Sequence, residues 1–437
     1  MGSYRAFVRG RRLKLNTQIT NYLKEVIAKH TTVGRVPSAP FVVARSGKTI
    51  SLNDEGVKLL SEGSRQIIDS RKIIREGYTE GYVYHQLIDI VVSIQGATSS
   101  VLNTSLPREV KRLLSKLQSA PNECLFLVPV VNLKLTGLRR LLIGETSLHQ
   151  LNPSTLRHLE SRFKSVRMGV KGLLAERLAQ LQERNIHTYA VVKANVGEIK
   201  KGEDLAISKV ELSLDVLRLY NSKNKIGVPR EFAETVGMED IHYVCRKTGR
   251  ESGASYYANP PSKFSPFVID AAALDSMRKK GKLAEFSRLL REESVQNADK
   301  LAPKLLTALH WYGLSVKDER RVDKFVKLVV ALEALLLEND DVAGKKQKLA
   351  ERAAFILGKD MNTRNNVHKL VVELYGLRNE IVHEGRCDVR EQELLDLTIL
   401  VRSLIFAIIG ISSRRKSLKE IEDRIKEIEF SSHIRGV

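Results

Sequence analysis

Strand signals in this sequence end at about Ala271, and every later segment with a regular apolar pattern has the period of a helix. Helices alone bury their apolar stripes against one another, so residues 276–437 are expected to form an all-α bundle. The helices predicted there cover Leu283–Val295, Lys300–Tyr312, Asp318–Leu337, Lys345–Leu357, Val367–His383, Glu391–Ile411 and Leu418–Phe430.

The sequence before Ala271 mixes helix and strand signals. Residues 1–120 are predicted to be mainly helical, with one β-hairpin in which Phe41–Arg45 pairs with Thr49–Leu52 across a Ser46-Gly47 turn. Asn53 or Asp54 follows the hairpin and is placed to cap the next helix.

Residues 121–275 are expected to form a second, α+β region. Its predicted elements are strands between Cys124 and Gly144, a helix over 153–183, a strand at His187–Val196, a helix at Glu203–Tyr220 and short strands at Ile241–Arg246, Ala254–Ala258 and Pro266–Asp270. The predicted fold class is therefore an α+β N-terminal region followed by an all-α C-terminal bundle, in three parts with boundaries near residues 120 and 275.

Composition and charge narrow the class of protein. With 43% hydrophobic and 28% charged residues, the chain has the balance of a soluble globular protein, which excludes disorder. Residues 1–300 hold 48 Lys and Arg against 30 Asp and Glu, whereas residues 301–437 hold 24 against 21. The net charge of +21 therefore lies mostly in the N-terminal two thirds, where it would attract a polyanion such as nucleic acid.

Basic side chains near the N-terminus are candidate phosphate contacts, and they are Arg9, Arg11, Arg12, Lys14, Arg71, Lys72 and Arg75. The alternative is that these charges are scattered and solvated. Because the sequence has no aromatic RNA-binding motif, the charge favours attraction to nucleic acid without sequence recognition.

The spacing of the cysteines and the length of the apolar runs indicate the cellular compartment of the protein. No pair of cysteines has zinc-binding spacing, which predicts buried thiols in a reducing compartment, and the three are Cys124, Cys245 and Cys387. The basic N-terminus lacks the apolar stretch of a secretion signal. Residues 394–410 are apolar but short and carry Asp396 and Arg402, which favours a core helix over a membrane span. A cytoplasmic protein without a membrane partner is expected.

The segment VVELYGLRNEIVHEGR, residues 371–386, groups three side chains that could carry chemistry. On a helix Asn379 and His383 lie about 40° apart, while Arg378 lies about 140° from His383 and reaches it only with its long side chain or from a partner helix. An imidazole can move a proton from a ribose 2′-hydroxyl or to the leaving oxygen. A guanidinium stabilises the charge that gathers on phosphate. The trio therefore suits RNA cleavage without a metal, with Asn379 orienting either group.

A purely structural explanation of the same residues is also open. Arg, Asn and Glu near a helix end commonly cap or solvate it, and a histidine there is favoured by the helix dipole. The nearby Gly385 is placed to end the helix. A phosphate-binding loop at Gly47-Lys48-Thr49 is excluded because Val42 stands where the first glycine is required.

The C-terminal third resembles HEPN domains. Residues 378–383 fit the R-x4-H signature of that family, including the polar residue directly after the arginine. The runs ALHWYG at 308–313 and KFVKLVVALEALL at 324–336, with LYGLRNEIVHEG as the closing helix, are similar to the ApeA-like HEPN group. The resemblance covers about residues 280–412, and it does not extend to the N-terminal region.

The resemblance implies a dimeric helical bundle that cleaves RNA without metal or cofactor. In such families arginine and histidine from two copies form one composite endoribonuclease site, often in bacterial defence against phages through abortive infection. Arg378, Asn379 and His383 are then the expected catalytic residues, RNA the substrate and a homodimer the assembly. The N-terminal region would sense a phage or cellular trigger that the sequence does not identify.

Two other functions stay open. A catalytically silent HEPN module could serve dimerisation or nucleic-acid binding in a larger complex, and an enzyme using the same residues could transfer a phosphate-containing group to a partner. Glu333, a carboxylate within an apolar run, either holds Arg378 or His383 in place or bonds another polar group between helices. His310 and His368 lack a metal-binding motif and are interpreted as packing or surface residues.

Overall fold

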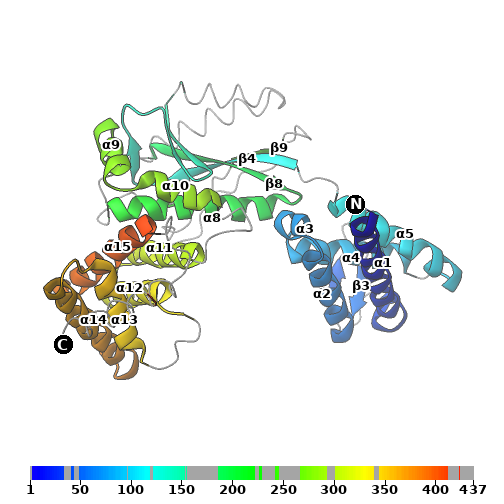
Figure 1. Ribbon diagram of the computed structural model, residues 1–437. Helices are drawn as coiled ribbons and strands as arrows, with labels where there is room; N and C mark the ends of the chain where they lie inside the picture. The colour runs from blue at the N-terminus through cyan, green and yellow to red at the C-terminus, as the bar shows by residue number, and fades with distance from the viewer. Residues whose placement is uncertain are drawn as a thin grey trace. The chain divides into compact units, whose positions relative to one another are not determined.

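The computed structural model of the chain forms two compact units (Figure 1). The first consists of Met1–Leu125, Lys193–Ala206 and Val244–Arg250, and the second of Phe126–Val192, Ile207–Tyr243 and Glu251–Val437. The structure describes residues 2–33, 41–43, 49–95, 97–118, 122–152, 154, 186–221, 226–228, 242–245, 266–292, 301–338, 344–411 and 423.

Helices dominate the first unit. They are α1 (Gly2–Glu25), the π-helical turn η1 (Val26–His30), α2 (Asp54–Asp69), α3 (Lys72–Gly77), α4 (Glu80–Ile94) and α5 (Ser99–Gln118). Apolar side chains of α1, α2, α4 and α5 form one core, which includes Ile19, Leu23, Leu60, Ile67, Leu87, Val91, Val110 and Leu114. Asn53 accepts from Gly56 N at 2.9 Å, so Asn53 rather than Asp54 is the N-cap of α2.

A small antiparallel sheet accompanies these helices. It has the order β1-β3-β2, with β1 (Thr31–Val33), β2 (Phe41–Val43) and β3 (Thr49–Leu52). The pairing of β2 with β3 confirms the predicted hairpin, and its register places Val42 opposite Ile50. The predicted turn at Ser46-Gly47 lies outside the described residues.

A distant segment is tied into the first unit at Glu198. Glu198 Oε2 accepts from both the backbone N and the hydroxyl of Thr79, at 2.7 and 2.6 Å. The carbonyl of Gly77 accepts from the backbone N–H groups of Gly197 and Glu198, both at 2.9 Å. Residues about 120 positions apart therefore share hydrogen bonds to a charged group, which are stronger than neutral ones.

The later strands form a five-stranded sheet in the order β6-β7-β8-β4-β9. The strands are β4 (Asn122–Val130), β6 (Arg140–Ile143), β7 (Thr146–Gln150), β8 (Thr188–Val196) and β9 (His242–Cys245). Strands β6 and β7 form a tight antiparallel hairpin whose turn begins at Gly144, with φ of +60°. A parallel pair, β5 (Leu133–Leu135) with β10 (Phe267–Ile269), completes the strands of this region.

The long helix α8 (Ile199–Tyr220) packs on this sheet. The hydroxyl of Ser213 donates to the carbonyl of Ile143 at 3.2 Å, and that of Thr146 donates to the carbonyl of Lys209 at 3.2 Å. These bonds fix the β6–β7 hairpin against α8.

After β10 every described element is a helix. They are α9 (Ala271–Lys279), α10 (Leu283–Glu292), α11 (Leu301–Lys317), α12 (Arg321–Leu336), α13 (Lys345–Leu357), α14 (Met361–His383) and α15 (Glu391–Ile411). α12 shows why they pack: its apolar residues recur at three and four and are buried, from Phe325 and Leu328 to Leu332 and Leu336. The predicted fold class, α+β followed by all-α, is confirmed for the described residues.

α15 is the one described helix whose length and hydropathy would also let it cross a membrane. Core helices of soluble proteins share these properties. It packs against α11, α12 and α13, and seven of its apolar side chains are buried. Arg402, the charge noted in the sequence, lies exposed, while Asp396 accepts from Gln392 at 2.7 Å.

Some predicted elements and thiols need comment. The helix expected over 153–183, except for residue 154, the strand at Ala254–Ala258 and the helix at Leu418–Phe430, except for residue 423, lie outside the described residues. Cys124 is buried as predicted. The prediction is wrong for Cys387, which is exposed because it lies in the loop after α14 instead of on a packed element.

Candidate functional site

The helix α14 carries the predicted trio close to its C-terminal end. It begins with a capping box in which Thr363 N donates to Asp360 Oδ1 at 2.8 Å and Asp360 N donates to Thr363 Oγ1 at 3.1 Å. It ends at His383, and Gly385 follows with φ of +75°, the conformation that favours glycine. Its buried apolar face, which includes Leu374 and Leu377, packs against α12 and α13.

Arg378, Asn379 and His383 are brought together within this one helix. Arg378 Nη1 donates to Asn379 Oδ1 at 3.3 Å and lies 3.4 Å from His383 Nε2. Both distances are long for hydrogen bonds. The flexible arginine side chain thus spans the angle of about 140° between the two positions. This contact lies within a single chain.

A guanidinium has only donors, so the contact is a hydrogen bond only in the tautomer of His383 whose Nε2 carries no proton. His383 is exposed and Asn379 is half-buried, so both are accessible to a ligand.

Glu333 and Tyr375 complete the cluster from the other side. The hydroxyl of Tyr375 on α14 donates to Glu333 Oε1 on α12 at 2.8 Å, and the same oxygen lies 4.0 Å from Arg378 Nε. The guanidinium carbon of Arg378 lies 5.7 Å from the centre of the Tyr375 ring. Glu333 therefore bonds a polar group of another helix, as one of the two explanations predicts, and its carboxylate lies 4.0 Å from Arg378.

Burial and the Glu333 carboxylate raise the pKa of Tyr375 to about 12. The phenol therefore stays protonated across the physiological range and remains a donor to Glu333. Sequence reasoning missed Tyr375, although its position three residues before Arg378 on the same helix is a usable signal.

The loop after His383 is held by a second arginine. Arg386 Nη1 donates to Glu380 Oε2 at 2.7 Å, and its Nη2 lies 3.6 Å from Glu393 on α15. The backbone N of Arg386 also donates to the carbonyl of Glu380 at 3.2 Å. The C-terminal end of α14, and with it His383, is therefore fixed by charge-assisted bonds.

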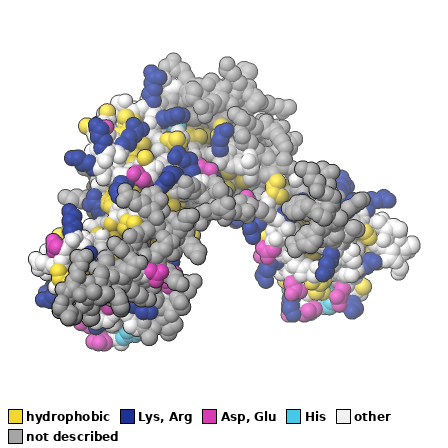
Figure 2. Space-filling view, viewed as in Figure 1, with side chains coloured by type: hydrophobic (Ala, Val, Ile, Leu, Met, Phe, Trp, Pro, Cys, Tyr) yellow, Lys and Arg dark blue, Asp and Glu magenta, His cyan; other side chains and the backbone are white. Residues whose placement is uncertain are grey.

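The candidate phosphate contacts of the first unit are only partly described. Lys14 and Arg75 are exposed and Arg71 is half-buried, while the side chains of the other four predicted residues lie outside the described part. On the face drawn in Figure 2, Lys and Arg side chains are scattered among acidic and apolar ones. Both explanations of the basic surplus therefore stay open.

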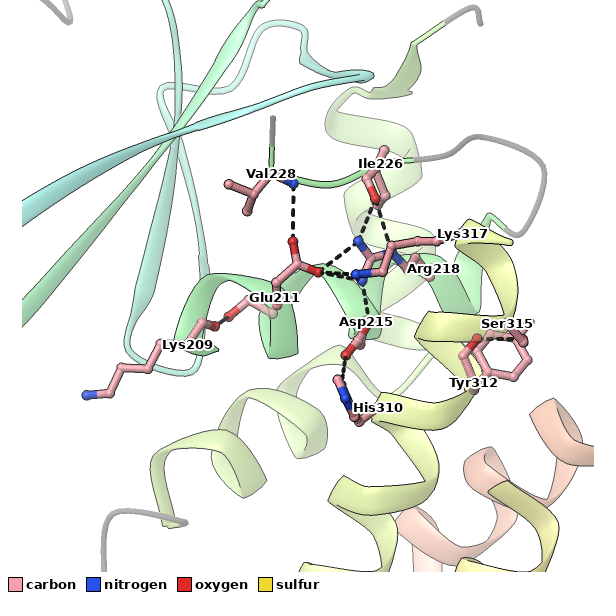
Figure 3. A network of polar contacts seen from close by, with 11 residues as sticks. Lys209, Glu211, Asp215, Arg218, Ile226, Val228, His310, Tyr312, Ser315 and Lys317 are labelled. Atoms are coloured by element: carbon pink, nitrogen blue, oxygen red, sulfur yellow. Dashed lines mark hydrogen bonds and ion pairs between the residues drawn. The ribbon is translucent and has the colours of Figure 1, made fainter. Parts of the chain in front are cut away.

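A second polar cluster, which sequence reasoning missed, lies between α8 and α11 (Figure 3). The fully buried Arg218 donates to Glu211, to Asp215 and to the carbonyl of Ile226. Lys317 of α11 donates to Glu211 at 2.9 Å. Because 106 positions separate Glu211 from Lys317, no local sequence pattern predicts this cluster.

The charges of this cluster are mutually compensated. Burial would raise the pKa of Glu211, but Arg218 and Lys317 outweigh it and hold that pKa below its usual value. The half-exposed His310 lies 3.4 Å from Asp215, and this hydrogen bond raises the pKa of His310 against the effect of burial. The network joins α8 to α11 through the contacts of Glu211 with Lys317 and of Asp215 with His310.

Within the described residues, the histidines do not lie together in a possible metal site. His310 is a member of the buried cluster, and His368 is half-buried on α14. No group of three or more His, Cys, Asp or Glu in the described part of the chain is placed to hold a metal ion.

Comparison of the chain with models of known protein families, with curated proteins and with solved structures found no match. The resemblance to HEPN domains therefore rests on the residues of α11, α12 and α14, and it stays a prediction.

Proposed function

We propose that the chain is an endoribonuclease in which Arg378 and His383 cleave RNA without a metal or a cofactor. The observation that carries this proposal is the contact between Arg378 Nη1 and His383 Nε2 at the accessible end of α14. A charge stabiliser and a group that transfers protons lie within one phosphate's reach of each other, which is the pairing that phosphodiester chemistry needs.

The reaction is an internal transesterification. The ribose 2′-oxygen attacks the adjacent phosphorus while its proton passes to a base, and the bond from phosphorus to the 5′-oxygen breaks as that oxygen takes up a proton. The products are a 2′,3′-cyclic phosphate and a 5′-hydroxyl. His383 takes the proton of the 2′-hydroxyl through an unprotonated ring nitrogen, and solvent water gives a proton to the leaving 5′-oxygen. Arg378 stabilises the charge on the phosphate oxygens, and Asn379 orients Arg378.

The assay uses purified protein and single-stranded RNA in EDTA. Cleavage by the wild type is expected to persist in the chelator and to stop when the 2′-hydroxyl at the cleaved position is methylated. His383→Ala and Arg378→Ala are expected to lose about 10²- to 10³-fold in rate. His368→Ala, which removes a half-buried histidine of the same helix, is the matched control and should cleave normally.

Intact RNA under all conditions would reject the nuclease. Unchanged tight RNA binding with no cleavage would instead favour the silent HEPN module, and transfer of label from a nucleotide to a partner would favour the transferase. Both the nuclease and the silent module are expected to pair with a second copy, and α15 exposes about half of Leu395 and Ile399 and α14 half of Val382, at 49%, 53% and 49%. Side chains of this kind suit contact with a second copy.

The cellular role that we propose is antiphage defence through abortive infection by a cytoplasmic homodimer. RNA cleavage would stop growth of the infected cell, and the N-terminal region would respond to a trigger. Expression of the wild type together with a phage should arrest growth, and His383→Ala should restore it. Arrest that persists in this variant would separate the role from the nuclease.

A further inference from the structure

The first unit separates its charges by helix. α2 holds two basic and four acidic residues, α4 holds two acidic and no basic ones, and α5 holds four basic and one acidic. Basic side chains that serve only solubility are usually interspersed with acidic ones. α2 follows this pattern, with Lys58 lying 3.7 Å from Glu55. α5 departs from it, because its surplus of positive charge is not matched on the same helix.

The basic residues of α5 share one exposed face. All four side chains are exposed, and they are Arg108, Lys111, Arg112 and Lys116. Because a helix advances 100° per residue, they lie within an arc of about 140°. Glu109, the one acidic residue of the helix, lies at the edge of this arc. The opposite side of α5 is buried in the core of the unit through Leu106, Val110, Leu113, Leu114 and Leu117.

This arrangement is unfavourable for the helix itself. Arg112 lies four positions after Arg108 and four before Lys116, and like charges at that spacing repel each other. The helix dipole favours cations only in the last turn, so it accounts for Lys116 and not for the others. A polyanion that lies along this face would replace the repulsion with attraction.

Carboxylates of the unit leave these charges accessible. Arg112 is 79% exposed and lies 3.7 Å from Glu109, a surface pair that contributes little. Within the described residues, no ion pair involves Arg108 or Lys111. The positive face of α5 is therefore open to a ligand from solvent.

α5 presents its charges from a fixed position. Lys24 of α1 donates to Asn103 Oδ1 at 2.7 Å, and Lys116 donates to Gln86 Oε1 of α4 at 3.1 Å. These bonds and the buried apolar side of α5 hold the helix against its neighbours. Cations on a rigid element lose less freedom on binding than cations on a mobile tail.

The shape of this face selects the kind of polyanion. α5 contains no aromatic residue, so it lacks the stacking platform with which proteins bind single-stranded nucleic acid. The major groove of B-DNA is about 12 Å wide and admits a helix of about 10–12 Å diameter, whereas that of duplex RNA is too narrow. Lys111 and Arg112 point about 100° apart, so they can reach phosphates on opposite sides of such a groove.

We propose that α5 is a DNA-binding helix, whose four basic side chains contact the sugar-phosphate backbone of duplex DNA on both sides of the major groove. None of these residues is among the phosphate contacts predicted from the sequence. The inference goes beyond the proposed nuclease and does not depend on it, because it concerns a different ligand and the first unit alone. It gives the N-terminal region a partner distinct from the RNA substrate.

The experiment measures binding of the full chain to a fluorescently labelled DNA duplex of mixed sequence by anisotropy, between about 50 and 200 mM salt. DNA has no 2′-hydroxyl, so the proposed RNA cleavage cannot destroy the probe, and failure of binding is distinct from failure of the nuclease. The variant Arg108→Gln/Lys111→Gln/Arg112→Gln should lower the slope of log affinity against log salt by about two to three. At about 0.1 M salt it should bind about a hundredfold more weakly.

Two controls separate this effect from net charge and from folding. Arg278→Gln/Lys279→Gln/Lys280→Gln removes the same charge from the exposed end of α9, and it should change the slope by less than about one. Arg108→Lys/Arg112→Lys keeps the charge of α5 and should bind within about threefold of the wild type. Melting temperatures are measured for all variants.

Several outcomes would overturn the inference. They are a wild type that does not bind the duplex, an unchanged salt slope in the α5 variant, and an equal loss in the α9 variant. Tighter binding of single-stranded RNA of the same length, or of vesicles that contain phosphatidylserine, would mean that the face serves another polyanion and would reject DNA as its ligand.

Discussion

The guanidinium of Arg378 lies beside one nitrogen of the His383 imidazole, with Nη1 3.4 Å from Nε2. Reagents that acylate histidine attack an unprotonated ring nitrogen, and the guanidinium restricts access to Nε2. We expect carbethoxylation of His383 to be slower in the free wild type than in Arg378→Ala, as measured by peptide mass spectrometry. The rate at His368 serves as internal control, and equal rates at His383 in both proteins would contradict the expectation.

Arg218 shows how much a single buried charge contributes. Its side chain is fully buried and donates to two carboxylates and a carbonyl, so Arg218→Met leaves Asp215 and Ile226 without their donor. Such a loss costs about 3–5 kcal/mol in free energy of unfolding. The matched control is Arg320→Met, which also removes an arginine paired with an aspartate three positions away but at 75% exposure, and should cost about 0–1 kcal/mol.

Denaturant unfolding measures both changes. Equal losses in the two variants would mean that the buried network contributes no more than a surface pair.

His310 makes stability depend on pH in a defined direction. Its hydrogen bond to Asp215 raises the pKa above the usual 6.5, although burial and the nearby Lys317 oppose the rise. A raised folded pKa means that the contact stabilises fully below the unfolded pKa, and that this contribution is lost as the pH rises through the folded value. His310→Gln should therefore lower the melting temperature more at about pH 5.5 than at about pH 8.5. A pH-independent difference, or one that grows toward high pH, would contradict this.

At the scale of elements, α11 approaches α8 only because it carries glycine at one position. A methyl group at Gly313 would meet the buried carboxylate of Asp215. Gly313→Ala should therefore lower stability by about 1–3 kcal/mol, although alanine is the better helix former. Gly376 in α14 has open space around it, so Gly376→Ala should raise stability by about 0.5–1 kcal/mol.

Thermal and denaturant unfolding of the two variants measure these opposite changes in stability. A gain in both would show that α11 can shift away from Asp215 at little cost.

Helix boundaries could be predicted where apolar periodicity and glycine punctuation agree. The ranges of α13 and α15 were predicted to the residue, and the end of α14 at His383 followed from Gly385. The start of α14 lies six residues earlier than predicted, because MNTRNN has no apolar period and its helix is begun by the Asp360–Thr363 capping box. Strand β7 and helix α9 were not predicted, since a short element is decided by the partner on which it packs.

The candidate site could be predicted from the sequence only in part. Helix periodicity places Asn379 and His383 on one face, whereas the contact of Arg378 with His383 depends on the conformation of the arginine side chain. Glu333 could be suspected as a carboxylate in an apolar run, but its bond to Tyr375 depends on how α12 packs against α14. The Glu211–Arg218–Lys317 cluster depends on the packing of α8 and α11 and therefore lay beyond sequence reasoning.

At the scale of the whole molecule, the first unit is built from separate stretches of chain. Glu198, carried by Lys193–Ala206, supplies the acceptor for Thr79. A fragment that begins at Phe126 also cuts strand β4 and leaves Glu198 without both donors. We expect this fragment to melt lower than the full chain and to elute as larger species in size-exclusion chromatography, and a monodisperse fragment of unchanged melting temperature would contradict this.

Because the two units are interleaved along the chain, they cannot be exchanged as separate modules. Recombination or an engineered fusion could exchange only the residues up to Leu125. The exchanged part would then be an incomplete first unit, and the rest of that unit would stay in the host chain without its partners. Any chimera that exchanges the first unit must carry the 193–206 and 244–250 stretches along with the N-terminus. We therefore expect the two units to be inherited together.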